Sequence, residues 1–248
     1  GLSSTVGAYS QSLRPLLVKL IHSWLAQGKK KSTVVATPDP SVTKLVGDEI
    51  QRRVSWKWSE FVDGKNGFLY GIPANAPHVV KFDPADKSMA EIGPALSTGS
   101  GFPFKWRCGV RANNGNIYCA PCSVNPNERM LKINTNSDTV EVLDHVDLPE
   151  IGESLWKSGA LASDNCIYYM PYCARCILRL DPDTETLTSV GEDLEPGIDA
   201  KYNGSVLGTD NCIYGIPYKA TRIAKFDPTD PGSISFVGEK YAGCHDFE

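Results

Sequence analysis

The sequence predicts an all-β protein, a β-propeller of four-stranded blades. The first observation is an internal repeat in which a tyrosine is followed three positions later by a proline. The four copies occupy residues 69–73, 117–121, 167–171 and 213–217, and their tyrosines are 48, 50 and 46 residues apart. The second observation is that each copy holds several short apolar segments separated by turn residues. Self-similarity at this period, with short strands, is typical of propeller blades.

Each copy carries further equivalent positions. Twelve residues before each tyrosine stands a large aromatic residue: Trp58, Trp106, Trp156 and Tyr202. A basic residue follows each tyrosine in a short apolar segment: Lys81, Lys132, Arg179 and Lys225. Because large aromatic side chains supply much of the apolar area at such contacts, we expect the four aromatic residues to pack between neighbouring blades.

The second copy shows how one blade is read from its residues. The expected strands are 105–112, 116–120, 130–133 and 139–143, each rich in apolar or β-branched residues. Asn113-Asn114-Gly115 is a hairpin turn signal between the first two strands. Pro121 ends the second strand because proline has no N–H to donate to a neighbouring strand. The other copies follow the same plan, so we expect four antiparallel strands per blade.

The number of blades is less directly determined. Residues 33–47 match the last two strands of a repeat and precede the first full copy. We therefore expect four full repeats plus a partial N-terminal one, giving a five-bladed propeller over residues 33–248. The alternative is that the chain continues beyond Glu248. Either arrangement removes an open sheet edge, which would otherwise pair with other chains.

Residues 1–32 differ from the repeats and predict a short amphipathic helix with a linker. Its apolar stripe has helical spacing: Leu13, Leu16, Leu17, Leu20, Ile21, Trp24 and Leu25. Ser12 is a suitable N-cap, and Gly28 is suited to end the helix. The stripe either packs on the propeller or docks on another subunit or a membrane surface. Leu17 and Trp24 are the candidate contact residues of a docking helix.

The repeat resembles the kelch-type family of β-propellers. Ile117-Tyr118, the segment 131–133 and the turn 181–184 are similar to the family's second strand, third strand and turn. The resemblance covers about residues 56–238 and implies a blade of four strands. One difference is that Gly-Ile-Pro, Cys-Ala-Pro or Tyr-Met-Pro stands where kelch blades carry a glycine pair.

Composition excludes several classes of protein. The net charge is −4 and the one basic cluster is Lys29-Lys30-Lys31, so we expect no nucleic-acid partner. No run of eighteen apolar residues predicts a membrane span, and no signal-peptide pattern opens the chain. The chain begins at Gly1, so its localisation is unknown from the sequence. Cys166 and Cys212 occupy equivalent positions in successive repeats, too far apart for a disulfide, which favours a reducing intracellular compartment.

Two CxxC motifs are candidates for a metal site. Cys119, Cys122, Cys173 and Cys176 could supply four thiolates to zinc, or form redox disulfides. The two motifs occupy different positions in their repeats, so we favour free thiols and expect no cofactor. The thiols outside the strands, Cys122, Cys173 and Cys176, are expected to react faster than Cys166 and Cys212.

The candidate binding face lies where loops between strands two and three meet loops between successive blades. Its candidate residues are aromatic or basic: His78, Arg129, Tyr172, Arg175, Tyr218, Lys219 and Arg222. Aromatic and arginine residues are enriched at protein interfaces. The loops between blades on the same face are acidic over 144–153 and 192–199.

No catalytic residue is predicted, because the four histidines do not recur with the repeat and no nucleophile motif is present. We therefore expect a non-enzymatic protein–protein interaction module or accessory subunit, which binds other protein subunits through the loops and the N-terminal helix. The alternative is a metal-dependent propeller hydrolase or lyase with its site in the central channel. Only the acidic loops, which could supply oxygen ligands, support that alternative.

Overall fold

We describe the fold from a computed structural model of the chain, for residues 55–96, 104–122, 129–144, 148, 156–230 and 233–240. The chain separates into two compact units, Gly1–Leu45 and Val46–Glu248. All described residues belong to the second unit. The expected N-terminal helix, the expected strands within 33–47 and the expected boundary at residue 33 lie outside the described residues.

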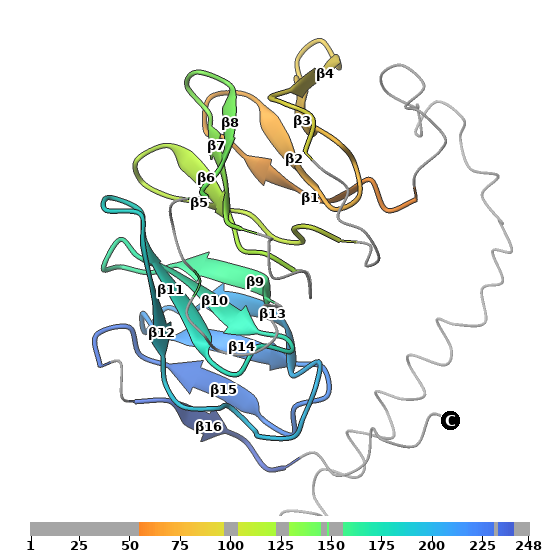
Figure 1. The fold of residues 1–248 in the computed structure, drawn as a ribbon. Helices are drawn as coiled ribbons and strands as arrows, with labels where there is room; N and C mark the ends of the chain where they lie inside the picture. The colour runs from red at the N-terminus through yellow and green to blue at the C-terminus, as the bar shows by residue number, and fades with distance from the viewer. Residues whose placement is uncertain are drawn as a thin grey trace, which may run out of the picture. The chain divides into compact units, whose positions relative to one another are not determined.

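The described residues form four antiparallel sheets of four strands each, which we call blades 1 to 4 (Figure 1). Blade 1 contains β1 (Trp58–Asp63), β2 (Leu69–Pro73), β3 (Val79–Phe82) and β4 (Met89–Ile92). Blade 2 contains β5 (Val110–Arg111), β6 (Asn116–Cys119), β7 (Leu131–Asn134) and β8 (Thr139–Val142). Blade 3 contains β9 (Trp156–Leu161), β10 (Ile167–Pro171), β11 (Ile177–Asp181) and β12 (Thr186–Val190). Blade 4 contains β13 (Tyr202–Leu207), β14 (Ile213–Pro217), β15 (Ile223–Phe226) and β16 (Ser235–Val237).

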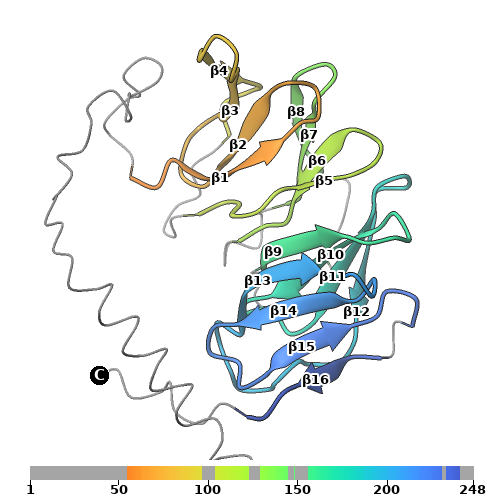
Figure 2. The same ribbon diagram turned by 180° about the vertical axis from the view of Figure 1, so that it is seen from behind.

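In every blade the strands follow one another in chain order, so each sheet is a simple up-and-down meander. The innermost strands β9 and β13 of neighbouring blades lie side by side, as both views show (Figures 1 and 2). This is a β-propeller of four-stranded blades, as the repeat predicts. The described residues contain no helix. None of their segments could therefore cross a membrane as a helix.

A bulge interrupts the innermost strand of every blade just after its aromatic residue. In blade 1 the pairing changes register between Trp58 and Phe61, and blade 4 shows the same shift between Tyr202 and Ser205. In blade 2 the bulge leaves Trp106 as an isolated bridge to Pro121, and regular pairing resumes only at β5. The expected continuous strand over 105–112 is therefore wrong. A bulge bends its strand and turns the side chains of the extra residues in a new direction.

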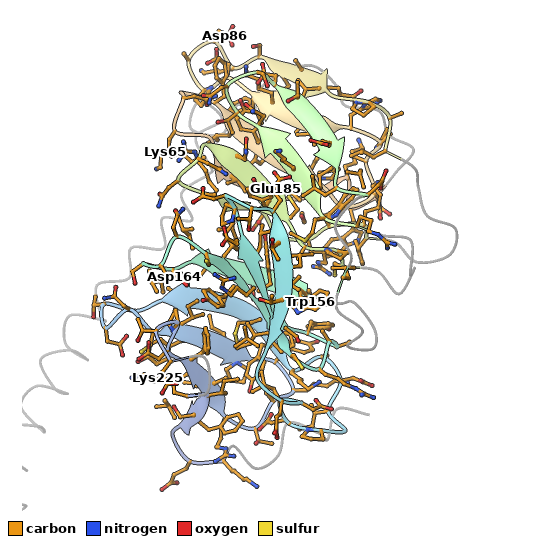
Figure 3. All side chains as sticks on the ribbon, turned by 60° about the vertical axis from the view of Figure 1, so that its left-hand side comes forward. Lys65, Asp86, Trp156, Asp164, Glu185 and Lys225 are labelled. Carbon is orange, nitrogen blue, oxygen red and sulfur yellow. The ribbon has the colours of Figure 1, made fainter. Side chains whose placement is uncertain are left out.

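The repeated aromatic residues pack between blades as expected wherever a preceding blade is described. Trp106 is 2% exposed and packs with Ile72 of blade 1, and Trp156 and Tyr202 are fully buried at the two following junctions. Figure 3 shows Trp156 where blade 3 meets blade 2. Trp58, at the start of the first described blade, is only half-buried.

The three repeated tryptophans also make the same hydrogen bond, each within its own blade. The indole N–H of Trp58, Trp106 and Trp156 donates to the backbone oxygen of His78, Arg129 and Cys176, at 3.0, 2.8 and 3.1 Å. The acceptor precedes the third strand in each case. The bond fixes the aromatic ring against the loop between the second and third strands.

The repeated tyrosine and basic residue join blade 1 to blade 2. The Tyr70 hydroxyl donates to Asp138 Oδ1 at 2.9 Å, and Lys81 Nζ lies 2.6 Å from Asp138 Oδ2. Asp138 belongs to the turn between β7 and β8. The side-chain N–H of Asn66 donates to the backbone oxygen of Thr135 in the same turn, at 2.6 Å. We call this arrangement, and its equivalent between blades 2 and 3, an inter-blade bridge.

In blades 3 and 4 the hydroxyl of the repeated tyrosine has its hydrogen-bond acceptor within the same blade. Asp164 and Asp210 stand where Asn66 and Asn114 stand in blades 1 and 2. The hydroxyls of Tyr168 and Tyr214 donate to these aspartates at 2.7 and 2.8 Å. In blade 2 the Tyr118 hydroxyl donates to Glu185 of blade 3 at 3.0 Å. The tyrosine of each described blade therefore has one carboxylate acceptor, which comes from the following blade where the turn carries asparagine and from the same blade where it carries aspartate.

Candidate binding site on the loop face

Main-chain hydrogen bonds bring two sets of loops together at one end of the blades. The N–H of Lys201 donates to the backbone oxygen of Tyr172 at 2.7 Å, and that of Leu194 to Arg175 at 3.0 Å. The N–H of Lys105 donates to Ala74 at 2.9 Å. The loops between the second and third strands thus contact the segments that lead into the next blade. We call this end the loop face, with residues 56–57, 74–78, 104–107, 121–122, 129, 157, 172–176, 194–201 and 218–222.

Two buried lysines fasten the loop face. Lys105 and Lys201 each precede the repeated aromatic residue and are 4% and 3% exposed. Lys105 Nζ donates to the backbone oxygen of Ala76 at 2.8 Å, and Lys201 Nζ donates to that of Ala174 at 3.2 Å. Each bond ties the start of one blade to the loop of the blade before it, so the loops are held by the fold.

The bulges place two cations on this face. Arg107 and Lys157 each follow the repeated aromatic residue directly, where blades 1 and 4 carry Ser59 and Asn203. In blade 3 the register shifts between Met170 and Pro171, opposite Lys157. Bulged residues often carry function because the extra residue re-aims its side chain.

Both cations lie close to aromatic rings. Lys157 Nζ lies 3.1 Å from the centre of the Tyr172 ring, and that ring lies 6.1 Å from the Tyr218 ring. Arg107 Cζ lies 4.7 Å from the centre of the Phe104 ring and 5.8 Å from that of Trp56. These distances are within the range of cation–π attraction. We call the set the cation–aromatic cluster; its members are Trp56, Phe104, Arg107, Lys157, Tyr172, Tyr218 and Lys219.

The two halves of the cluster act on each other electrostatically. Burial lowers the pKa of Lys157, and repulsion by Arg107 lowers it further. Burial raises the pKa of Tyr172, while the positive charges of Arg107 and Lys219 act in the opposite direction. The thiol of Cys122 lies in the same field: burial raises its pKa to about 11 against the effect of Lys157 and Arg107. Arg107 is therefore close enough to disfavour the charged form of Lys157.

Neither cation has a carboxylate partner within the part of the chain that the structure describes. Several other basic side chains of the blades have such a partner: Lys65 with Asp63, Lys81 with Asp138, Lys132 with Glu185, Arg175 with Asp193, and Lys225 with Asp210. Two rings of the cluster are also open to solvent, since Trp56 is 64% exposed and Tyr218 is 57% exposed. Unpaired cations beside exposed aromatic rings are suited to bind an anionic group with apolar neighbours.

The structure gathers only part of the predicted binding set. Tyr172, Tyr218 and Lys219 belong to the cluster. Arg175 instead faces Asp193, with Nε 3.9 Å from Oδ2, and Arg222 lies over the Phe236 ring at 4.3 Å.

The remaining predicted residues have other surroundings. His78 Nδ1 is 3.3 Å from the backbone oxygen of Gly93, and its own backbone oxygen accepts from Trp58. The backbone oxygen of Arg129 accepts from Trp106 in the same way. Leu17 and Trp24 lie outside the described residues.

Sequence reasoning missed Arg107, Lys157, Trp56 and Phe104. The available signal was the position after the repeated aromatic residue, where two successive copies carry a cation. The bulge that turns these side chains towards the loops could not be read from the sequence. Without it, a residue next to a buried tryptophan in a strand is expected on the opposite side of the sheet.

The zinc expectation receives no support from the described residues. Cys119 is buried in the core between blades 1 and 2, whereas Cys122 lies beyond Pro121 on the loop face. Cys122 and Cys173 lie near each other, but Cys176 is buried beside Asp193 and Arg175. No three His, Cys, Asp or Glu side chains of the described segments are placed to hold one metal ion.

The expected order of thiol reactivity is partly wrong. Cys122 and Cys176 are 5% and 8% exposed, although both lie outside the strands. Only Cys173 among the three is half-buried. The loops of this face pack against the next blade, which covers side chains that the sequence suggested were open.

Comparisons with known proteins agree on the fold. No protein-family model matches the chain, and no curated protein matches it in sequence. A streptogramin B lyase structure superposes with a TM-score of 0.56 at 16% identity, covering 73% of this chain and 55% of that chain. A virginiamycin B lyase from Staphylococcus aureus, with quinupristin, gives 0.55 at 14% identity, covering 71% and 53%. An auxiliary nutrient binding protein from Bacteroides ovatus gives 0.51 at 16% identity, covering 74% and 42%.

The chain thus spans about half the length of these lyase chains. The similar structures have mixed functions. At such low identity the likeness supports the β-propeller fold and carries over no reaction or ligand.

Proposed function

We propose that this protein is a kelch-like β-propeller that acts as a non-enzymatic protein–protein interaction module, an accessory subunit of a larger assembly. It binds its partner through the loop face, with the N-terminal segment as a second contact. The observation that carries the proposal is the cation–aromatic cluster. Tyrosine, tryptophan and arginine are the side chains that dominate binding energy at protein interfaces.

The scaffold around the cluster suits a binding role. The loops are tied to the next blade by the bonds of Lys105 and Lys201, so they lose little conformational freedom when a partner binds. The innermost strands also offer few groups for acid–base chemistry. Apart from Asp63 at the end of β1, the one carboxylate on β1, β5, β9 and β13 is Glu60. Its pKa is raised by burial, and it accepts a bond from the Gly109 N–H at 2.5 Å.

The experiment compares two variants that each remove one exposed aromatic ring. Tyr218 is 57% exposed in the cluster, and Phe61 is 50% exposed on β1. The tagged full chain, Tyr218→Ala and Phe61→Ala are used to recover partners from the extract of the source organism, followed by mass spectrometry. We expect a partner that the full chain and Phe61→Ala retain and Tyr218→Ala loses.

If Tyr218→Ala, and also the double variant that adds Tyr172→Ala, recovered the partner as well as the full chain does, the proposed face would be contradicted. The alternative, a metal-dependent hydrolase or lyase, is tested on the same preparation. Stoichiometric calcium or magnesium that raises the melting temperature would favour the alternative over the interaction module.

A further inference from the structure

The cation–aromatic cluster contains a charge imbalance that no carboxylate of the described residues offsets. Burial lowers the pKa of Lys157, and repulsion by Arg107 lowers it further. Among the described residues, rings and not carboxylates are their neighbours. A group that places negative charge between the two cations would remove this repulsion and gain attraction from both. The site is therefore better suited to an occupied state than to an empty one.

We propose that the cation–aromatic cluster binds an acidic segment of a protein, in which glutamate or aspartate side chains alternate with apolar ones. The inference rests on the proposed function and names the chemistry of the partner. Arg107 and Lys157 hold a carboxylate, and Lys219 adds a third positive charge beside Tyr172. The exposed rings of Trp56 and Tyr218 contact the apolar side chains on either side.

The geometry at Arg107 favours a carboxylate. Arg107 Cζ lies over the Phe104 and Trp56 rings, and a guanidinium group presents five N–H donors in a planar fork. These donors match the two oxygens of a carboxylate. The ammonium group of Lys157 is a point charge, so it attracts the carboxylate without requiring a particular orientation.

The same features argue against a nucleic acid. Recognition of a phosphate backbone requires a basic stripe that follows many phosphates, whereas the cation–aromatic cluster offers three cations on a chain of net charge −4. The acidic residues Asp193, Glu195 and Asp199 also lie in the loop-face segment 194–201 or directly before it. They would repel an extended polyanion, but a short segment with spaced carboxylates avoids them.

The test uses three labelled eight-residue peptides and the full chain. One peptide alternates glutamate with leucine, one alternates glutamate with serine, and one alternates lysine with leucine. Binding is measured by fluorescence anisotropy. We expect binding of the glutamate–leucine peptide, with affinity falling as salt rises from about 0.05 to about 0.5 M because exposed charges are screened. The other two peptides should bind at least about tenfold more weakly.

Charge reversal provides the matched control. Arg107→Glu with Lys157→Glu should lose the glutamate–leucine peptide and gain the lysine–leucine peptide. Lys65→Glu with Lys87→Glu makes the same change in net charge in the turns at the opposite end of blade 1, and should bind like the unmodified chain. If the reversed variant does not fold by circular dichroism, Arg107→Gln with Lys157→Gln takes its place and should lose binding.

Each outcome decides the inference. Retention of the glutamate–leucine peptide by the reversed or neutralised variant would overturn it, as would no binding by the unmodified chain. Displacement of the peptide by inorganic phosphate at equal ionic strength would show that the site prefers phosphate, which also overturns it. A partner that is lost in Tyr218→Ala while no acidic peptide binds would leave the proposed function intact and reject the acidic chemistry alone.

Discussion

Lys132 Nζ lies 2.6 Å from Glu185 Oε1 across the junction of blades 2 and 3, and the Tyr118 hydroxyl donates to the same oxygen at 3.0 Å. Glu185 is in the turn between β11 and β12, at the end of blade 3 that reaches blade 2 (Figure 3). The repeat supplies a tyrosine and a cation on one blade, and the next blade supplies the carboxylate. In blades 1 and 2 the repeated tyrosine and cation thus also join one blade to the next.

The first prediction concerns this carboxylate. Glu185→Gln should lower the free energy of unfolding by about 1–3 kcal/mol, because Lys132 and Tyr118 lose a partly buried anionic acceptor. Glu141 is the control, since it is 3.8 Å from Lys132 Nζ and its side chain is 56% exposed. Glu141→Gln should change stability by less than about 0.5 kcal/mol. Urea denaturation measures both, and equal effects would contradict the bridge.

The second prediction is the pH dependence of the same bridge. The hydrogen bond to Glu185 raises the pKa of Lys132, and burial raises the pKa of Tyr118. A raised pKa means that the folded state holds the proton more tightly than the unfolded state. The stabilisation is therefore complete below about pH 10 and is lost as pH rises through the folded-state pKa values. Denaturation at pH 8 and above pH 10 should show a steeper loss for the unmodified chain than for Glu185→Gln.

The sequence predicted the part of the fold that repeats. Tyrosine, proline and turn residues recur in each copy, so the second, third and fourth strands of the blades could be placed to within a few residues. The bulge after Trp106 could not be predicted, because register depends on pairing across strands that a single copy does not reveal. The buried lysines had a visible signal, since lysine precedes the aromatic residue at positions 57, 105 and 201. Because lysine side chains are rarely buried, the residue type alone argues against a buried position.

The candidate site was predicted only in outline. The loop face was expected from propeller geometry, and Tyr172 and Tyr218 do meet there. Arg175 and Arg222 are equally basic in the sequence, yet the fold pairs one with Asp193 and places the other over Phe236. Which cations remain unpaired depends on neighbours from other blades, which the order of residues alone does not give.

The third prediction distinguishes the tryptophans by burial. Trp156→Ala should cost about 3–5 kcal/mol, because the ring is fully buried and its indole N–H bond to Cys176 is also lost. Trp58→Ala should cost roughly half of that or less, because Trp58 is half-buried. Thermal and urea denaturation compare the two. An equal cost would mean that another segment covers Trp58 as a blade covers Trp156.

The fourth prediction concerns the close packing between blades 1 and 2. A Cβ atom on Gly109 would lie 2.7 Å from Ile72 Cδ1 and 3.0 Å from Ile117 Cγ2, and both isoleucines are fully buried. Gly109→Ala should therefore destabilise the protein by about 1–3 kcal/mol. At Gly204 the nearest atom is Ile216 Cδ1 at 3.1 Å, and Ile216 is 53% exposed and able to move. Gly204→Ala is the control and should have a smaller effect in the same denaturation assay.

The last prediction is the order in which the thiols react. Burial raises the pKa of Cys108 and Cys119 well above the usual thiol value and raises those of Cys122 and Cys166 to about 11. Thiolates are the reactive form, so these thiols should react slowly at pH 8. Cys173 is half-buried while the other described cysteines are buried, and it lies in the positive field of Lys157. Cys173 should therefore be alkylated first.

Peptide mapping after timed alkylation in a Cys244→Ala background, which removes the cysteine outside the described residues, measures that order. Cys173→Ser should abolish the fast phase and leave the slow labelling unchanged, because no other described thiol combines access with a nearby cation. The unfolded protein should label at every site and serves as the reference. Labelling of Cys119 as fast as Cys173 would show that the junction between blades 1 and 2 opens on the timescale of the reaction, and equally fast labelling of Cys108 would show the same for the junction between blades 2 and 3, since both thiols are buried there in the folded state.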